Sequence, residues 1–182
     1  MLGVRWATTF HSRMDQIRVE VTRPTHVPGY HAALDAVARE RRYLAFLQAP
    51  PLDQSAQFVQ WLGTGAGLHY VAITAEDAVV GWCDVVRHPH EGFTHVGQLG
   101  MGVLGGYRRR GVGRQLLQAA LDGGRAIGLR RLELEVFRSN AAAVLLYESF
   151  GFQHEGAKRD ARILDGITDD VLIMARVVTP AI

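Results

Sequence analysis

The segment from Tyr107 to Leu117, YRRRGVGRQLL, combines residue types that bind phosphate. Three consecutive arginines run into glycines, and a leucine-rich pattern of helical period begins immediately afterwards. The first amides of a helix have no partner within it and lie at the positive end of its dipole, so they form an anion site. Gly111 and Gly113 would leave that backbone open to close approach. The segment predicts a pyrophosphate site, with a solvated basic turn before an ordinary helix as the alternative.

Two other phosphate-binding loops fit the same glycines less well. A P-loop needs Lys and Ser or Thr after its last glycine, whereas a valine and a glycine follow Gly111. Gly100, Gly102 and Gly105 spell G-x-G-x-x-G, but a dinucleotide-binding loop turns from strand into helix at its glycines. Here they lie along a predicted strand, and the helix begins only at about Gly111.

A second segment, NAAAVLLYESFGF from Asn140 to Phe152, places three side chains on one helical face. Asn140, Ala143 and Tyr147 have the spacing i, i+3, i+7. Ser139 or Asn140 is suited to cap this helix, and Gly151 is suited to end it. The segment therefore predicts a short helix that presents an amide and a phenol on the same side.

With these two segments the chain resembles the GNAT superfamily of N-acetyltransferases. The first is similar to the family's acetyl-CoA motif R/Q-x-x-G-x-G/A, matched by Arg108, Gly111 and Gly113, and the second to N-x-x-A-x-x-LYE-x-x-GF. The similarity runs from about Gly100 to Met174. Within it, LEVFRSNAAAVLLYESFGF resembles the ribosomal-protein alanine N-acetyltransferase branch without a gap, whereas the N-terminal half matches only in its order of elements.

The resemblance implies an acetyl-CoA site. The strand backbone from Met101 to Val103 would hydrogen-bond the acetyl-pantetheine arm, and main-chain N–H groups from Arg109 to Arg114 would hold the pyrophosphate. Asn140 would contact the arm. The complete set of CoA-binding residues that the resemblance implies is Met101, Gly102, Val103, Arg108, Arg109, Arg110, Gly111, Val112, Gly113, Arg114, Asn140, Ala143 and Tyr147.

Direct acetyl transfer needs an unprotonated amine, a donor for the oxyanion, and a proton for the departing thiolate. By the resemblance Tyr147 lies beside the thioester sulfur, and a phenol of pKa about 10 can act as the general acid; a core tyrosine is the alternative. A backbone N–H between residues 100 and 103 is the expected oxyanion donor.

The general base has two candidates. Glu135 lies opposite the leucine face of the strand LELEVF, and it matches the proton acceptor described in the alanine branch. His95, on the strand that enters the cofactor site, is the rival because its reference pKa is near neutrality. A paired strand carboxylate and a satisfied edge histidine are the structural alternatives for these two residues.

The rest of the chain must supply a scaffold for these segments. Hydrophobic periodicity gives the order strand, two helices, three strands, helix, strand, helix and final strands. This order predicts an α/β fold with a mixed, mostly antiparallel sheet flanked by helices, as in the GNAT acyl-CoA N-acyltransferase fold. Residues 14–182 are expected to form one domain, residues 1–13 a loose tail, and Met14 is a possible alternative start.

Composition narrows the function classes. Of the 182 residues, 48% are hydrophobic and 21% charged, which is ordinary for a folded domain and argues against disorder. The net charge of +2 does not indicate a dedicated nucleic-acid binder. Cys83 is the single cysteine, so no internal disulfide can form, and no apolar run is long enough to span a membrane.

The sequence therefore predicts a cytoplasmic, acetyl-CoA-dependent N-acetyltransferase. The acceptor is a primary amine, favoured as a small molecule over a protein or peptide N-terminus. A homodimer is possible, and neither a nucleic acid, a membrane nor a metal is expected, since His88 and His90 lie in a loop without further ligands. A non-catalytic acyl-CoA sensor is the alternative of a different class.

Overall fold

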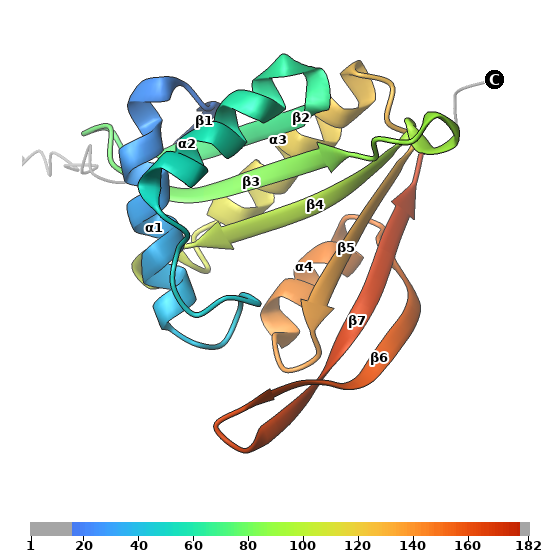
Figure 1. Ribbon diagram of the computed structural model, residues 1–182. Helices are drawn as coiled ribbons and strands as arrows, with labels where there is room; N and C mark the ends of the chain where they lie inside the picture. Colours follow the sequence, from blue (N-terminus) through green and yellow to red (C-terminus); the bar gives the residue numbers. More distant parts are fainter. Residues whose placement is uncertain (1–15, 179–182) are drawn as a thin grey trace, which may run out of the picture.

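The computed structural model describes residues 16–178, so the predicted tail and the alternative start at Met14 lie outside the described residues. Its centre is a seven-stranded sheet with strand order β1-β2-β3-β4-β5-β7-β6 (Figure 1). Every neighbouring pair is antiparallel except β4 and β5. The strands are β1 Arg18–Val21, β2 Gly67–Ile73, β3 Val79–Arg87, β4 Val96–Val103, β5 Arg131–Phe137, β6 Gln153–Leu164 and β7 Ile167–Val177.

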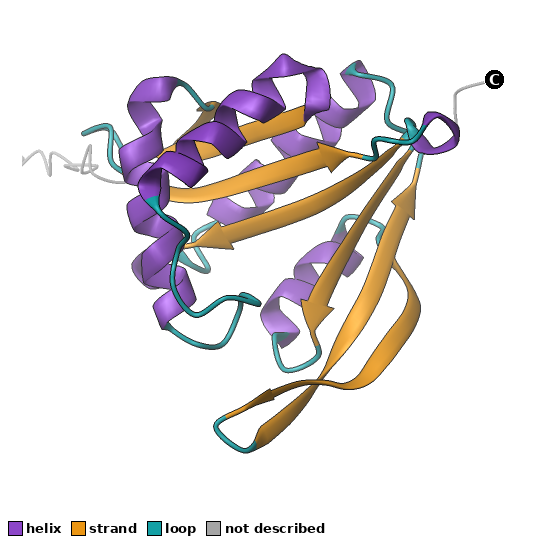
Figure 2. Cartoon of the chain, viewed as in Figure 1, coloured by secondary structure: helices purple, strands orange, loops and turns teal. Residues whose placement is uncertain are grey.

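Four α-helices cover the two faces of the sheet (Figure 2). Helices α1 and α2 pack on one face, and α3 and α4 on the other. The helices are α1 Val27–Arg39, α2 Leu52–Trp61, α3 Val112–Ala126 and α4 Ala141–Ser149. The mixed, mostly antiparallel sheet flanked by helices that the sequence predicts is confirmed, as is the order of elements.

Period-two alternation along β3 divides the protein into two cores. Cys83 and Val85 face the core beneath α3 and α4, which also holds Leu116 and Met174. Trp82 faces the opposite way, into the core that α1 and α2 cover. Both faces of the central strands are therefore buried, which explains why β3 is a nearly continuous apolar run.

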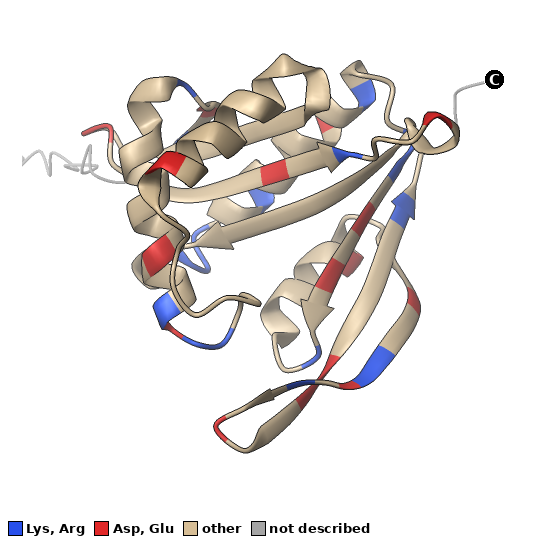
Figure 3. Ribbon diagram, in the orientation of Figure 1, with Lys and Arg blue, Asp and Glu red and all other residues tan. Residues whose placement is uncertain are grey.

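The parallel pairing of β4 with β5 is short, and this is the feature that opens the sheet. The register extends only from Val96 opposite Arg131 to Gln98 opposite Glu133. Beyond this the two strands diverge, and Figure 1 shows them separating toward their C-terminal ends. β4 carries no charged residue along its length, whereas β5 and β7 carry both signs (Figure 3). The opening therefore has an uncharged strand, β4, on one side and two strands with charged residues, β5 and β7, on the other.

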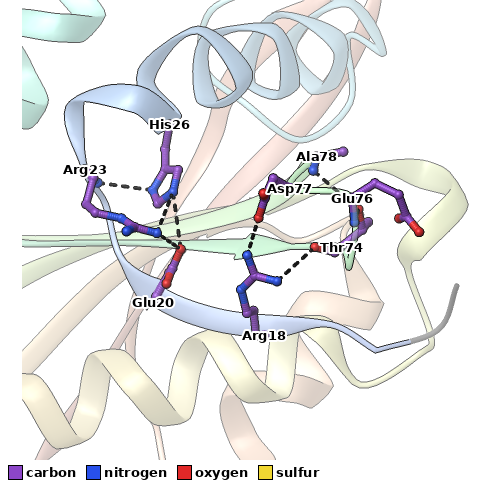
Figure 4. A network of polar contacts seen from close by, with 8 residues as sticks. All are labelled: Arg18, Glu20, Arg23, His26, Thr74, Glu76, Asp77 and Ala78. Atoms are coloured by element: carbon purple, nitrogen blue, oxygen red, sulfur yellow. Dashed lines mark hydrogen bonds and ion pairs between the residues drawn. The ribbon is translucent and has the colours of Figure 1, made fainter. Parts of the chain in front are cut away.

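A network of polar contacts holds the edge strand β1 (Figure 4). Arg18 pairs with Asp77 in the turn between β2 and β3 and lies 3.4 Å from the Thr74 carbonyl. Glu20 lies 3.2 Å from the ring of His26, at the start of α1. Charged side chains on an edge strand disfavour pairing with other chains, so this network both anchors β1 and protects the edge.

Candidate active site

The edge of β4 that faces the opening carries unpaired peptide groups. The Leu104 N–H donates to the Val80 carbonyl at 2.9 Å, so even-numbered residues of β4 direct their peptide groups toward β3. Because direction alternates along a strand, Met101 and Val103 direct theirs into the opening. Gly102 directs its own toward β3 and does not offer them to a ligand in the opening.

The glycines of β4 accommodate side chains of β3. A Cβ at Gly102 would lie 2.2 Å from the ring of Trp82, so only glycine fits there. A Cβ at Gly100 would lie 3.1 Å from both carboxylate oxygens of Asp84. The glycine-rich sequence of β4 therefore makes room for two large side chains of β3 on the face covered by α1 and α2.

The N-terminus of α3 offers a second set of unpaired amides. Its N-cap, Gly111, has φ of 81°, in the left-handed region that glycine adopts without strain, and Arg109 has φ of 60°. The Gln115 N–H makes the bond to the Gly111 carbonyl at 3.0 Å. The three amides between these residues have no carbonyl within the helix to bond, so they can receive an anion.

The structure gives a packing reason for one of these glycines. A Cβ on Gly113 would lie 3.2 Å from Leu146 Cδ2 and 3.4 Å from Met101 Cε, so it would point into the packing between helices and strand. Gly113 thus allows α3 to approach α4 and β4 closely. Whether its missing side chain also clears a path for phosphate stays a prediction.

The side chain of Arg108 braces the site. Its guanidinium donates to both carboxylate oxygens of Glu40, at 2.7 and 2.5 Å, and its Nε donates to the Val103 carbonyl at 2.7 Å. It also lies 4.5 Å from the centre of the Tyr43 ring. The Glu40 carboxylate raises the pKa of Arg108. Arg108 is therefore already engaged, and any phosphate contact from this segment rests on main-chain N–H groups and the following arginines.

A cavity of about 640 Å³, which we call the splay cavity, fills the opening between β4 and β5 and reaches the start of α3. Most residues that the sequence nominates for the site line it. They are Met101, Gly102, Val103, Arg108, Arg109, Gly111, Gly113, Arg114, Glu135, Asn140, Ala143 and Tyr147. Val112 is buried in the core below, and Arg110 lies over the Tyr107 ring at 5.8 Å, so neither side chain lines the cavity.

Tyr147 combines a core position with access to the splay cavity. It is 6% exposed, packs 5.7 Å from the Phe152 ring, and lies on α4. Burial, and then the nearby thiol of Cys83 and carboxylate of Asp84, raise its pKa. The phenol thus stays protonated at neutral pH and can donate. Asn140 caps the same helix, because its side chain accepts the Ala143 N–H at 3.3 Å, as the sequence predicts.

The structure brings one of the two expected bases to the site. Glu135 lines the splay cavity, but Lys158 forms an ion pair with it and the side chain is 47% exposed. His95 precedes β4 at the end where β4 and β5 are joined, and its carbonyl accepts the Arg130 N–H at 2.8 Å. Five residues of extended chain, about 17 Å, separate it from Gly100. His95 lines neither of the two cavities described here.

A second cavity of about 570 Å³ lies on the face covered by α1 and α2. We call it the aromatic cavity, because Tyr30, Phe46, Phe58 and Trp82 line it. It shares three lining residues with the splay cavity, namely Leu44, Gly100 and Met101. The two cavities therefore meet at the middle of β4.

Asp84, in the wall of the aromatic cavity, is a functional candidate that sequence reasoning missed. It lies directly opposite Gly100 in the register of β3 and β4, and burial raises its pKa to about 7. The available signal was a lone acid inside the apolar run VVGWCDVV, since a charged residue is seldom buried without a partner. Nothing in the pattern showed that this position borders a cavity.

His69 lies opposite Asp84 on the other neighbouring strand, β2. Its Nδ1 lies 2.8 Å from the Thr22 hydroxyl oxygen, and its Nε2 is buried with no hydrogen-bond partner within residues 16–178. Burial lowers the pKa of His69 to about 4, so the ring is neutral at pH 7. It therefore does not supply a positive charge to Asp84.

None of the helices between residues 16 and 178 combines the length and the hydropathy of a membrane span. Over the same residues, no three side chains of the His, Cys, Asp and Glu types gather as metal ligands would.

Comparison with known sequences gives a consistent result. A profile described as the acetyltransferase (GNAT) family matches residues 32–152. Over 69 residues the chain is 42% identical to a [ribosomal protein bS18]-alanine N-acetyltransferase of Escherichia coli; this covers 38% of the chain and 47% of that relative, about half its length. An L-amino acid N-acetyltransferase of the same organism is 29% identical over 161 residues, which cover 86% of this chain and 97% of the relative.

Solved structures show the same fold. A GNAT-family acetyltransferase from Streptococcus pneumoniae superposes with a TM-score of 0.83 at 23% identity, covering 90% of this chain and all of that one. A phosphinothricin acetyltransferase from Sinorhizobium meliloti, solved in complex with acetyl-CoA, superposes with a TM-score of 0.83 at 14% identity. The two chains are covered to 89% and 88%, respectively.

Proposed function

Since the chain belongs to the acetyltransferase (GNAT) family, we propose that it moves an acetyl group from acetyl-CoA directly to a primary amine. The observation that carries this proposal is the meeting of two sets of unpaired peptide groups in one cavity. The peptide groups of Met101 and the N–H of Val103 face the splay cavity, and the first amides of α3 lie at its other end.

This arrangement fits acetyl-CoA. A pantetheine arm carries amides that can pair with Met101 and Val103 as a neighbouring strand would, and a diphosphate can bind the amides that open α3. Asn140 and Ala143 line the same wall and would contact the arm. When bound, the cosubstrate supplies an acyl group activated as a thioester.

Protein groups would then manage the protons. The Tyr147 phenol donates to the departing sulfur, which general-acid catalysis allows because the phenol is protonated at neutral pH. An N–H of β4 that faces the opening stabilises the charge that develops on the carbonyl oxygen. The proton of the amine goes to a carboxylate at the cavity, for which the family resemblance nominates Glu135.

A small-molecule amine is the acceptor that we favour over a protein N-terminus. The L-amino acid N-acetyltransferase matches nearly the whole of both chains, whereas the match to the alanine N-acetyltransferase covers about half of that relative. The resemblance to the alanine branch runs from about Gly100 to Met174, beyond α1 and α2, which cover the aromatic cavity. Similarity in the shared core therefore carries less weight for the choice of acceptor.

Thiol release together with calorimetry tests this function. We expect the protein to bind acetyl-CoA and to release CoA thiol with at least one member of a panel of amines, amino acids and N-terminal peptides. Tyr147→Phe should bind acetyl-CoA normally but turn over about 10²–10⁴-fold more slowly, the usual contribution of a general acid. Tyr70→Phe, in the same core but lining neither cavity, is the matched control.

Two outcomes would contradict the proposal. Absence of acetyl-CoA binding would remove the cofactor site. Binding without thiol release across the panel would instead favour an acyl-CoA sensor.

We place the protein in the cytoplasm, because a single cysteine suits a reducing compartment. A homodimer stays a prediction, which sedimentation analysis would check.

A further inference from the structure

The carboxylate of Asp84 lies where the two cavities meet. It lines the aromatic cavity, and both of its oxygens lie over Gly100, at 3.1 Å from the position of a Cβ on that residue. Gly100 and Met101 also line the splay cavity, in which we place the thioester. If the proposed function holds, an amine held by Asp84 would approach the acetyl group across the middle of β4.

This carboxylate has no cationic partner in its surroundings. The titratable groups that interact with it are Tyr30 of α1, Cys83 of β3 and Tyr147 of α4, and His69 lies opposite it on β2. Burial keeps His69 neutral at pH 7 and raises the pKa of the other three groups, so all four are uncharged. Among the described residues that line the aromatic cavity there is no Lys or Arg. The half-buried Asp84 carboxylate has hydrogen bonds to the Trp82 side chain and to its own backbone but no counter-ion, and an incoming ammonium would supply one.

The rest of the lining points to the body of the acceptor. Four aromatic side chains and several aliphatic ones make up most of the lining, beside the uncharged polar side chains of Gln48, Gln54 and Ser55. The volume of about 570 Å³ exceeds what a single aromatic ring needs. A second carboxylate on the ligand would enter the same enclosure beside Asp84, with no cation to bind it. Like charges at short range in a poorly solvated site repel strongly.

We infer that Asp84 binds the amine of the acceptor and takes its proton, and that the acceptor is an apolar primary amine without a free carboxylate. Glu135 is less suited to this role, because Lys158 already pairs with it and it does not line the aromatic cavity.

The reaction balances with the groups present. The bound ammonium first gives one proton to the Asp84 carboxylate, which releases it to water, so that the nitrogen regains its lone pair. That lone pair forms the N–C bond to the thioester carbonyl carbon, and the C–S bond breaks. One N–H proton passes to the Asp84 carboxylate, and the sulfur leaves with the proton of Tyr147. Return of one proton from Asp84 to the tyrosinate, directly or through water, restores both groups.

Three related probes test the acceptor class. 2-Phenylethylamine has no carboxyl group, L-phenylalaninamide has a neutral one, and L-phenylalanine has a free carboxylate. We expect kcat/KM for the amine and the amide to exceed that for the amino acid by at least about tenfold, the effect of roughly 1.4 kcal/mol. Equal or better use of L-phenylalanine would overturn the inference. So would a protein that acetylates other amines of the panel but none of these three probes.

Variants test the residue. In Asp84→Asn, kcat/KM for 2-phenylethylamine should fall about 10²–10⁴-fold, and the rise of kcat/KM with pH near neutrality should disappear. Binding of acetyl-CoA, measured by calorimetry, should be unchanged and shows that the variant is folded. Asp53→Asn, an exposed acid in the first turn of α2, is the control and should keep both the activity and the pH profile.

The outcomes separate this inference from the proposed function. If the wild type acetylates amines but Asp84→Asn retains both its rate and its pH profile, only the inference fails. Loss of the pH dependence in Glu135→Gln in place of Asp84→Asn would return the role to Glu135. If Asp84→Asn does not fold, the three probes on the wild-type protein decide. Failure of the wild type to release thiol with any amine removes the proposed function itself.

Discussion

In its position in the fold, the carboxyl group of Asp84 costs free energy whenever it is ionised. Its pKa is about 7 in the fold, against a reference value of 3.8. The native state therefore binds more protons than the unfolded state between these values, and stability falls as pH rises from about 4 to about 7. This pKa shift corresponds to about 4 kcal/mol of stability, which is present at low pH and fully lost above pH 7.

From this we predict that Asp84→Asn stabilises the protein at high pH. At pH 8 the variant should be more stable than the wild type by up to about 4 kcal/mol, and the difference should shrink toward zero near pH 4. Urea unfolding of both proteins at each pH measures this. His69 protonates over part of this range in both proteins, so its effect cancels in the difference. A variant less stable than the wild type at pH 8 would show that the ionised carboxylate is compensated.

Individual residues differ in how well the sequence predicted them. The motif residues Gly111, Asn140 and Tyr147 reach the splay cavity because local chemistry fixes their backbone or helical face. Asp84 was missed because its significance comes from α1 and α2 packing over β3, a contact between distant segments. His95 was nominated because it was expected to lie on the strand that enters the cofactor site. It precedes the start of that strand, however, and is too far along the chain from Gly100 to reach the site.

At the scale of elements, β4 is hydrogen-bonded to a neighbouring strand along one edge, while the other edge is open near its C-terminal end. Its even-numbered residues bond to β3, while Met101 and Val103 direct N–H groups into the splay cavity. Periodicity predicted the strand and its neighbours well, since each pattern is local. Periodicity did not predict the divergence from β5, because strand pairing is nonlocal and leaves no periodic signal.

We predict a residue-alternating pattern of amide exchange along β4. In the free protein the amides of Met101 and Val103 should exchange quickly, and acetyl-CoA should protect them. Those of Gly100 and Gly102, bonded to β3, should be protected with or without ligand. Hydrogen exchange followed by NMR measures each amide separately. Protection of all four in the free protein would mean that the edge is already occupied.

At the scale of the whole molecule, contacts from the segment after α1 secure the opening. Glu40 holds Arg108 near the start of α3, and both side chains are about one-third exposed. The next residue, Arg41, reaches Asp165 in the turn between β6 and β7 at 2.8 Å, and its carbonyl accepts from Arg162 at 2.6 Å. These contacts join the two halves of the divided sheet across the side remote from the β4–β5 pairing.

We predict unequal energies for these two ion pairs. Glu40→Gln should destabilise the protein by about 1–3 kcal/mol, since it removes a charge-assisted, bidentate and partly buried partner of Arg108. Asp165→Asn should cost at most about 1 kcal/mol, because the Arg41 pair is exposed to solvent. Urea unfolding of both variants checks the order. The reverse order would place the main brace at the hairpin turn.

The three-residue pairing of β4 with β5 also bears on what happens after the chemistry. The contacts proposed for acetyl-CoA involve its pantetheine arm and its diphosphate, and acetyl transfer leaves both of these parts unaltered. Free CoA should therefore bind in the splay cavity about as tightly as acetyl-CoA does and compete with it. The rate of acetylation would then respond to the ratio of acetyl-CoA to free CoA around the protein.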